Sequence, residues 1–187
     1  MDKDMKTISA ENYCINVTDG THDSPKSQPD GYPLITSKHL GFFTLDKDSA
    51  NRISEDDYKA IQSRSSVEQW DLLISMIGTV GRVYLETSTN IDYACKNVGI
   101  FKMGGDESKA KWLYYYLSSP DGQSQLHSML RGTTQKYIPL NALRSLSIPV
   151  LSDQDDMNEI VGLLWAIDLK IRVNARINKN LSDLDFT

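Results

Sequence analysis

The chain has 187 residues, enough for one domain with an appended element or for two small domains, and either arrangement can bury a core. The hydrophobic fraction of 40% is ordinary for a globular protein, and the apolar runs are too short to cross a bilayer, so no membrane span is expected. The formal net charge of −5 argues mildly against a nucleic-acid partner, but residues 109–151 carry five basic residues against one acid, which leaves room for a positive face.

The N-terminus and the cysteines set the expected environment of the chain. Residues 1–7 are mostly charged and polar and contain no apolar stretch, so we expect no secretion signal there and predict a cytoplasmic location. Cys14 and Cys95 have neither CxxC spacing nor a neighbouring histidine. This pattern predicts two reduced thiols and no metal site.

Residues 1–150 have the pattern of an α+β domain, with short apolar stretches separated by Gly, Pro, Asn and Asp. Residues 71–77 predict a buried strand, and the Gly-Thr-Val-Gly segment at 78–81 tolerates the positive φ angles of a tight turn. Residues 82–85 then predict the returning strand of a hairpin. A further strand is expected over 97–103.

Two helices and a last strand are predicted after this hairpin region. Asp106 is placed to cap a helix with an apolar stripe, and Pro120 is expected to stop that helix. A second short helix is predicted over 121–130, with the glycine that follows it as a C-terminal cap. A turn over 141–145 and a strand over 146–150 complete the domain.

Residues 152–187 predict a long helix that is separate from a first domain of residues 1–151. Acidic residues crowd its start, where negative charge meets the positive end of the helix dipole. Roughly thirty helical residues are expected there, which span about 45 Å, more than a domain of this size covers, so we expect the helix to project and to find a partner. The alternative is that it folds back over the globular part.

The long helix carries a coiled-coil pattern. Apolar and asparagine residues recur at alternating intervals of three and four, which is the spacing of a heptad seam. The asparagines either fix the register against a partner or mark where the seam meets solvent. The predicted seam consists of Met157, Ile160, Leu164, Ile167, Ile171, Asn174, Asn178 and Leu181.

No set of residues has the pattern of a catalytic or metal site. Glu107–Lys109 together with Asp92 have the residue types of a nuclease, but they open a predicted helix, where charges at a helix start explain them better. The acidic segment 46–57 lacks the glycine and glutamate of a calcium loop, so we expect a solvated acidic loop. The chain also lacks the Asn-Pro-Pro-aromatic or Asp-Pro-Pro-aromatic segment that an adenine methyltransferase needs. We therefore predict no catalytic residue on this chain.

Five segments and the helix that follows them form a recognisable series. They are Asp19–Lys26 (DGTHDSPK), Pro33–Lys38 (PLITSK), Asp71–Gly81 (DLLISMIGTVG), Arg131–Ile138 (RGTTQKYI) and Ile148–Val150 (IPV). Their order and spacing resemble those of the specificity (S) subunits of Type I restriction-modification enzymes, over nearly the whole chain. A typical member of that family carries two recognition domains and two helices, whereas this sequence holds one of each.

The resemblance implies a mixed α/β target recognition domain over 1–151, followed by a long coiled-coil helix over 152–187 that spaces two such domains and docks methylation subunits. The implied partners are double-stranded DNA, the methylation subunits and the restriction subunit. S-adenosylmethionine and ATP are expected on those subunits, with no cofactor on this chain. A homodimer through the helix would place two recognition domains at opposite ends and read an interrupted palindrome.

Sequence readout requires polar side chains that reach base edges from a scaffold anchored on phosphates. Loops rich in Thr, Ser, Gln, Lys and Arg suit both tasks, and we expect Gln135 and Arg131 to read bases. Taken singly, each such residue is equally compatible with a solvated loop. The expected DNA-contacting residues are Thr21, His22, Lys26, Lys38, Arg82, Arg131, Thr133, Thr134, Gln135 and Lys136.

A protein-interaction adaptor is the competing hypothesis from the sequence. In that case the acidic surface and the helix would bind other proteins, while the globular part would have lost DNA recognition. The net charge of −5 is consistent with it. A nuclease or methyltransferase is the third alternative, and binding of S-adenosylmethionine or nicking of DNA with magnesium would reveal it.

Overall fold

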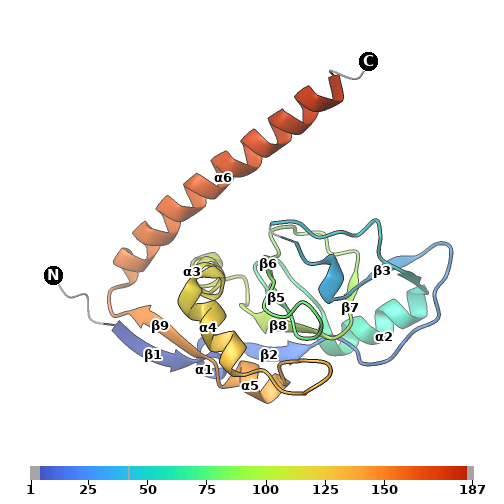
Figure 1. Ribbon diagram of the computed structural model, residues 1–187, viewed down its shortest axis with the longest axis horizontal. Helices are drawn as coiled ribbons and strands as arrows, with labels where there is room; N and C mark the ends of the chain where they lie inside the picture. Colours follow the sequence, from blue (N-terminus) through green and yellow to red (C-terminus); the bar gives the residue numbers. More distant parts are fainter. Residues whose placement is uncertain (1–4, 42, 185–187) are drawn as a thin grey trace.

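The computed structural model describes residues 5–41 and 43–184, apart from the side chains of 179 and 182–184. Small β-sheets and short helices form a body, and the helix α6 (Gln154–Leu184) runs out from this body as a rod (Figure 1). The α+β class and the long C-terminal helix predicted from the sequence are confirmed. No helix among the described residues is long and apolar enough to cross a membrane.

The central element is a four-stranded antiparallel sheet. Its strands are β2 (Asn16–Asp19), β8 (Val98–Lys102), β5 (Leu72–Ser75) and β6 (Val83–Leu85), in that spatial order. The predicted hairpin is β5 paired with β6, and the strand expected over 97–103 is β8. Both faces of β5 are covered, because alternate residues pack into two different apolar clusters. This double burial explains why the β5 segment is a continuous apolar run.

Two smaller sheets flank the central one. In the first, β1 (Met5–Ser9) pairs antiparallel with β9 (Ser147–Leu151). In the second, β3 (Tyr32–Ile35) lies between β4 (Arg52–Ile53) and β7 (Ala94–Cys95), antiparallel to β4 and parallel to β7. The short helix α1 (Ala10–Tyr13) follows β1, and the 3-10 helix η1 (Ser37–His39) follows β3.

The helices α3 (Glu107–Ser118) and α4 (Pro120–Ser128) match two sequence predictions with one difference. Asp106 caps α3 as predicted, because its carboxylate accepts a first-turn backbone N–H at 3.0 Å. Pro120 both follows the end of α3 and opens α4, since a proline lacks only an N–H that is free at a helix start. Ser119 separates the two helices and caps α4.

Besides the very short α1 and η1, two further helices were not predicted. Helix α2 (Glu55–Ser65) begins inside the acidic segment 46–57, which the sequence analysis had assigned to a loop, and its acidic first turn is capped by Ser54. Helix α5 (Leu140–Arg144) occupies the segment where a turn was expected. Both are short helices whose apolar residues are few, so their periodicity is weak in the sequence.

The rod α6 combines the two arrangements weighed from the sequence. Its first half lies on the body, where Met157 and Val161 are 3% and 4% exposed and Trp165 packs beside them. The described side chains beyond Arg172 are exposed, and this half projects. The predicted seam is corrected at its start, because Met157 is buried in the body core and Ile160 packs partly against that core.

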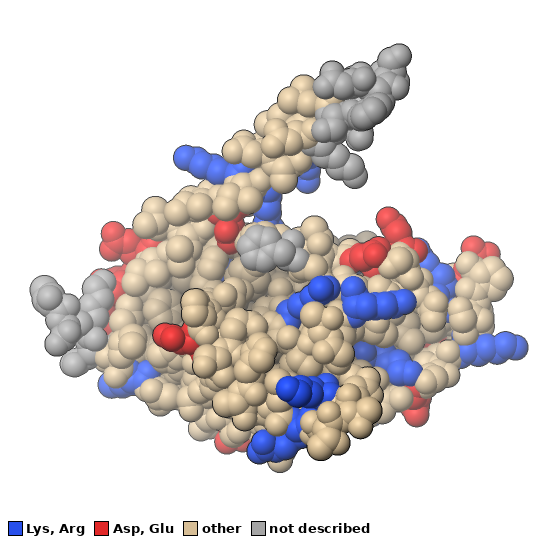
Figure 2. Space-filling model, viewed as in Figure 1, with Lys and Arg blue, Asp and Glu red and all other residues tan. Residues whose placement is uncertain are grey.

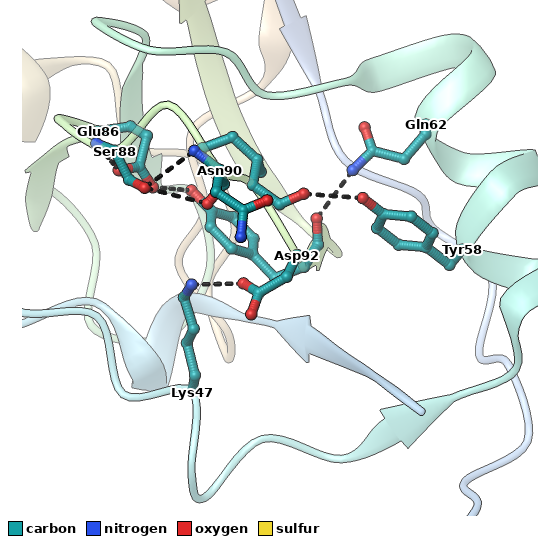
Figure 3. Close-up of polar contacts among 9 residues, drawn as sticks. Lys47, Tyr58, Gln62, Glu86, Ser88, Asn90 and Asp92 are labelled. Atoms are coloured by element: carbon teal, nitrogen blue, oxygen red, sulfur yellow. Dashed lines mark hydrogen bonds and ion pairs between the residues drawn. The ribbon is translucent and has the colours of Figure 1, made fainter. Parts of the chain in front are cut away.

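The loop between β6 and β7 is fixed by polar contacts (Figure 3). From α2, the Tyr58 hydroxyl and the Gln62 amide each donate to a carbonyl on this segment at 2.9 Å. Lys47 pairs with Asp92 at 2.5 Å, and the buried Glu86 accepts a backbone N–H within the loop at 2.7 Å. These contacts hold the β3–β4–β7 sheet and α2 against the central sheet.

Candidate nucleic-acid interface

The register of the central sheet brings several of the predicted loops to one end. β2 ends at Asp19 opposite Gly99, and β5 ends at Ser75 opposite Val98. The same end of the sheet is where β6 begins, at Val83. The Asp-Gly-Thr-His segment, the Gly-Thr-Val-Gly turn and the residue before β8 therefore emerge side by side, although they are far apart in the sequence.

The Asp-Gly-Thr-His segment is held close to β7. A Cβ atom on Gly20 would lie 2.2 Å from the Cys95 carbonyl oxygen, so only glycine fits. Thr21 donates its backbone N–H to that same carbonyl at 2.9 Å and is only 4% exposed. Its hydroxyl also accepts the Asp23 backbone N–H. The prediction of a DNA contact from Thr21 is corrected, because this side chain is buried and shapes the loop.

His22 is exposed and held by two neighbours. Its Nε2 lies 2.9 Å from an Asp19 carboxylate oxygen, and its Nδ1 lies 2.8 Å from the Asn97 side-chain oxygen. Asn97 has a φ of 52°, a left-handed conformation that asparagine tolerates better than most residues. These contacts fix the imidazole in one orientation at the end of the sheet. The sequence analysis did not single out Asn97, although an asparagine directly before a strand is a signal for such a backbone.

The predicted hairpin turn is confirmed in detail. Gly78 and Gly81 have φ angles of 80° and 87°, which strain any other residue. The Ser75 hydroxyl donates to the Thr79 carbonyl at 2.5 Å and accepts the Arg82 backbone N–H at 2.8 Å. The Thr79 carbonyl thus helps to close the turn. Arg82 follows the turn and is exposed.

The Arg131–Tyr137 segment forms a small loop that closes on itself. The backbones of Arg131 and Tyr137 exchange two hydrogen bonds, at 2.8 and 3.0 Å. Gly132 does not cap a helix as predicted; it sits in this loop with a φ of 85°, where a Cβ atom would lie 2.4 Å from the Gln135 carbonyl oxygen. The Ile138 N–H donates to the Met76 carbonyl and docks the loop on the hairpin.

The polar side chains of this loop are available for contact. Arg131, the two threonines at 133 and 134, Gln135 and Lys136 are all exposed. The loop and His22 border a cleft of about 300 Å³ with a largely apolar floor. The cleft is lined by Asp19, His22, Met76, Ile77, Asn97, Tyr137, Ile138, Pro139 and Leu140. Tyr137, which the sequence analysis left out, is 41% exposed and offers an aromatic face there.

The other predicted basic residues lie outside this cleft. Arg82 is exposed, and its guanidinium donates to the Leu40 carbonyl at 3.1 Å. It borders a groove of about 430 Å³ between this turn and α4. Lys38 is exposed on η1, and Lys26 is exposed in the β2–β3 loop. The structure therefore does not gather all of the predicted contacts around one cleft.

Charged side chains are distributed unevenly over the visible face (Figure 2). Lys and Arg side chains gather on the half of the body away from the N-terminus, with a few acidic side chains at its upper rim. A net charge of −5 is thus compatible with a locally basic face. Phosphate neutralisation depends on such local clustering rather than on the total charge.

The structure does not bring together Asp92 and Glu107, the two carboxylates considered from the sequence as part of a nuclease set. Asp92 pairs with Lys47, whereas Glu107 pairs with Lys111 at 2.5 Å on the first turn of α3, so the two carboxylates belong to separate clusters. Among the described residues no group of His, Cys, Asp or Glu side chains is arranged to hold a metal ion. Cys14 is free and buried, and burial raises the pKa of its thiol to about 12.

An α+β body with polar loops at one sheet end and a protruding helix is the class of fold that these observations define. It is the fold of the S subunits of Type I restriction-modification systems. The S subunit of such a system from M. genitalium superposes with a TM-score of 0.67 at 19% identity, covering 97% of this chain and 44% of that chain.

Two further solved structures share the fold. The HsdS subunit from Thermoanaerobacter tengcongensis matches with a TM-score of 0.58 at 18% identity, over 92% of this chain and 39% of its own. A chain from a study of complex assembly and conformational transition of the type I R-M system matches with a TM-score of 0.58 at 17% identity, over 92% of this chain and 40% of its own. This chain thus spans well under half the length of each. No family model matches the sequence, and no curated protein matches it.

Proposed function

We propose that this chain is a sequence-specific DNA-binding subunit of a Type I restriction-modification system, with no catalysis of its own. The observation that carries the proposal is the meeting of the Asp-Gly-Thr-His segment, the hairpin turn and the Arg131–Tyr137 loop at one end of the central sheet. The likeness of the fold to that of solved S subunits supports the same conclusion.

The exposed loop has suitable chemistry for reading DNA. A guanidinium pairs with two acceptors of guanine in the major groove, and a side-chain amide pairs with the donor and acceptor of adenine. Arg131 and Gln135 present these two groups on a loop whose ends are closed by backbone hydrogen bonds. Lys136, Lys38 and Arg82 supply charge for phosphates. His22 adds an exposed imidazole ring whose orientation is fixed by Asp19 and Asn97.

The partners follow from the same proposal. The chain directs separate methylation and restriction subunits to the DNA site, and S-adenosylmethionine and ATP bind to those subunits. The adaptor hypothesis differs at one point only, because an adaptor would bind the partner subunits without selecting a DNA sequence.

The rod gives the proposed homodimer its contact surface. Leu163, Ile167, Ile171, Ile177 and Leu181 are between 48% and 65% exposed and follow one side of α6. By helical periodicity this side is opposite the one that faces the body. Exposed apolar side chains along one side of a helix are typical of a helix that packs against another helix. An antiparallel pair of rods would hold two recognition bodies at opposite ends.

The dimer can be tested with two matched substitutions on the rod. Ile167→Lys lies on the exposed apolar stripe, whereas Leu169→Lys replaces an exposed apolar residue of the same helix away from it. We expect light scattering to give a dimer for the natural chain and for Leu169→Lys, and a monomer for Ile167→Lys. A strictly monomeric natural chain at high concentration would overturn this part of the proposal.

The DNA-binding role is tested by selecting fragments from a random oligonucleotide pool with the assembled complex. We expect one bipartite sequence to be enriched, with binding that weakens as salt rises. Arg131→Ala should lose the enrichment, whereas Lys59→Ala removes the same charge from α2, outside the candidate interface, and should keep it. Assembly with the partner subunits without any sequence enrichment would favour the adaptor.

A further inference from the structure

The rod meets the body through a set of aromatic and charged side chains on consecutive turns. Trp165, Asp168 and Arg172 lie on the body-facing side of α6, at intervals of three and four residues. Asp168 is 8% exposed although its charge would favour water. This contact occupies the last part of α6 before the helix becomes exposed.

Lys111 of α3 lies between two tryptophans. Its ammonium is 5.4 Å from the ring centre of Trp70 on the body and 4.3 Å from that of Trp165 on the rod. The two rings are 6.3 Å apart with an interplanar angle of 67°, an edge-on arrangement. Glu107 pairs with the same ammonium at 2.5 Å. A buried charge thus joins the two parts through the attraction between a cation and aromatic faces.

Arg172 makes the next aromatic contact, about two turns further along the rod. Its guanidinium carbon is 4.2 Å from the ring centre of Phe43 and 4.9 Å from that of Trp165. Its Nε is buried, and no described residue accepts a hydrogen bond from it. The side chain is therefore held largely by aromatic faces, which favour a planar guanidinium.

The two body residues in this cluster have strained backbones. Phe43 and Trp70 have φ angles of 59° and 71°, in the left-handed region that bulky side chains avoid. Such strain persists only where the surroundings fix it, and it gathers at functional sites. The remaining non-glycine residue with a positive φ in the described chain is Asn97, at the candidate interface. Both large side chains with this conformation contact the rod.

The turn that carries Phe43 also reaches the candidate interface. Gly41 donates its N–H to the Thr44 carbonyl at 2.9 Å and closes the turn. The Leu40 carbonyl at its start accepts the hydrogen bond from Arg82. One short turn thus contacts the rod through Phe43 and an exposed basic residue of the interface through Leu40.

We propose that Lys111, Trp165 and Arg172, together with Phe43 and Trp70, form a clamp of positioning residues that fixes the direction of the rod relative to the DNA-reading loops. This inference rests on the proposed function: the clamp sets the separation between the two DNA half-sites that a dimer accepts. Half-site separation is a geometric property of a two-fold reader, so a body free to swing on its rod would accept several separations.

The first experiment needs no DNA. Nitroxide labels are placed on exposed positions of the body and the rod, with Ala60→Cys on α2 and Asn180→Cys on α6, and the labelled chain is diluted with unlabelled chain. The native cysteines are buried. Pulsed electron–electron double resonance then gives the distribution of distances between the two labels within one chain. Each variant is first checked for folding by its thermal transition.

Two clamp variants and one control variant test whether the clamp fixes the direction of the rod. We expect a single narrow distribution for the natural chain and for Arg176→Ala, which removes an exposed arginine one turn beyond Arg172. Arg172→Ala and Lys111→Met should broaden the distribution. Narrow distributions in both folded variants would overturn the clamp.

The second experiment repeats the selection with pools in which the two half-sites are separated by different numbers of base pairs. The natural complex should enrich one separation, and Arg172→Ala should lose that preference while it enriches the same half-site sequences. A broadened distance distribution with an unchanged preferred separation would overturn the link to spacing. A natural complex that enriches no sequence would refute the proposed function, and the label distances would still decide the clamp.

Discussion

The Tyr115 hydroxyl donates a 2.6 Å hydrogen bond to a carboxylate oxygen of Asp168. The bond connects α3 to the middle of the rod, between the turns of Trp165 and Arg172. Burial raises the pKa of Tyr115, and the hydrogen bond to Asp168 raises it further. The phenol therefore stays protonated and remains a donor, which a buried carboxylate requires.

Tyr115→Phe is expected to lower the free energy of unfolding by about 1–3 kcal/mol, because it leaves the Asp168 carboxylate buried without this donor. Urea unfolding measures the change. A double-mutant cycle with Asp168→Ala, which removes the acceptor, isolates the pair, and a coupling energy near zero would show that the bond does not contribute.

Gly20→Ala should destabilise the chain by more than about 2 kcal/mol, because the added Cβ would collide with the Cys95 carbonyl oxygen, and that backbone belongs to β7. Gly162→Ala is the matched control. No atom lies within 4 Å of a Cβ at that position on α6, so the substitution should stabilise by about 0.5–1 kcal/mol. Thermal unfolding compares the two, and equal effects would contradict the packing at Gly20.

The burial of His39 predicts that the free energy of unfolding depends on pH. It is 3% exposed, and burial lowers its pKa in the folded chain, with Lys38 adding to the effect. As the pH falls below about 6.5, the unfolded chain therefore binds a proton before the folded chain does, and the free energy of unfolding decreases. Stability is fully regained above that pH.

The measurement is urea unfolding at several pH values between about 5 and about 8. His39→Asn should show a smaller loss toward acid, while Asn can still accept the Thr36 backbone N–H that the imidazole accepts at 2.9 Å. The comparison uses the slope with pH, because the variant also changes packing. An unchanged slope would mean that His39 does not titrate differently on folding.

Lys136 and Gln135 should have different effects on DNA binding. Lys136→Ala removes a charge for phosphate and should weaken binding to all sequences, reducing the slope of log K against log salt by about 1. Gln135→Ala should weaken binding to the selected site by about tenfold and relax selection at one position. Fluorescence anisotropy at several salt concentrations separates these results. A Gln135→Ala variant that keeps full selectivity would exclude this residue as a base reader.

Local signals in the sequence were sufficient for several elements. The apolar run of β5, two glycines with positive φ and the short return of β6 predicted the hairpin, because each feature acts within a few residues. The cap at Asp106 was predictable for the same reason. The polar loops were identified by residue type, and the structure exposes Arg131, Gln135 and their neighbours.

Long-range features could not be predicted in this way. The pairing of β1 with β9 and the contact of Asn97 with His22 depend on residues that only the fold brings together. The burial of Thr21 was missed because a threonine beside glycine and histidine looks like a polar loop residue. The two sides of α6 were merged into one seam, because the body-facing residues include Asp168 and Arg172, which carry no apolar signal.

The pairing of β1 with β9 places the two ends of the body next to each other at the root of the rod (Figure 1). Because β1 and β9 are paired, the chain enters and leaves the body at neighbouring positions. The segment between these two strands therefore forms one continuous unit. Exchange of the segment from Ser9 to Ser147 between chains of this fold should transplant target choice while leaving the rod and its attachments in place.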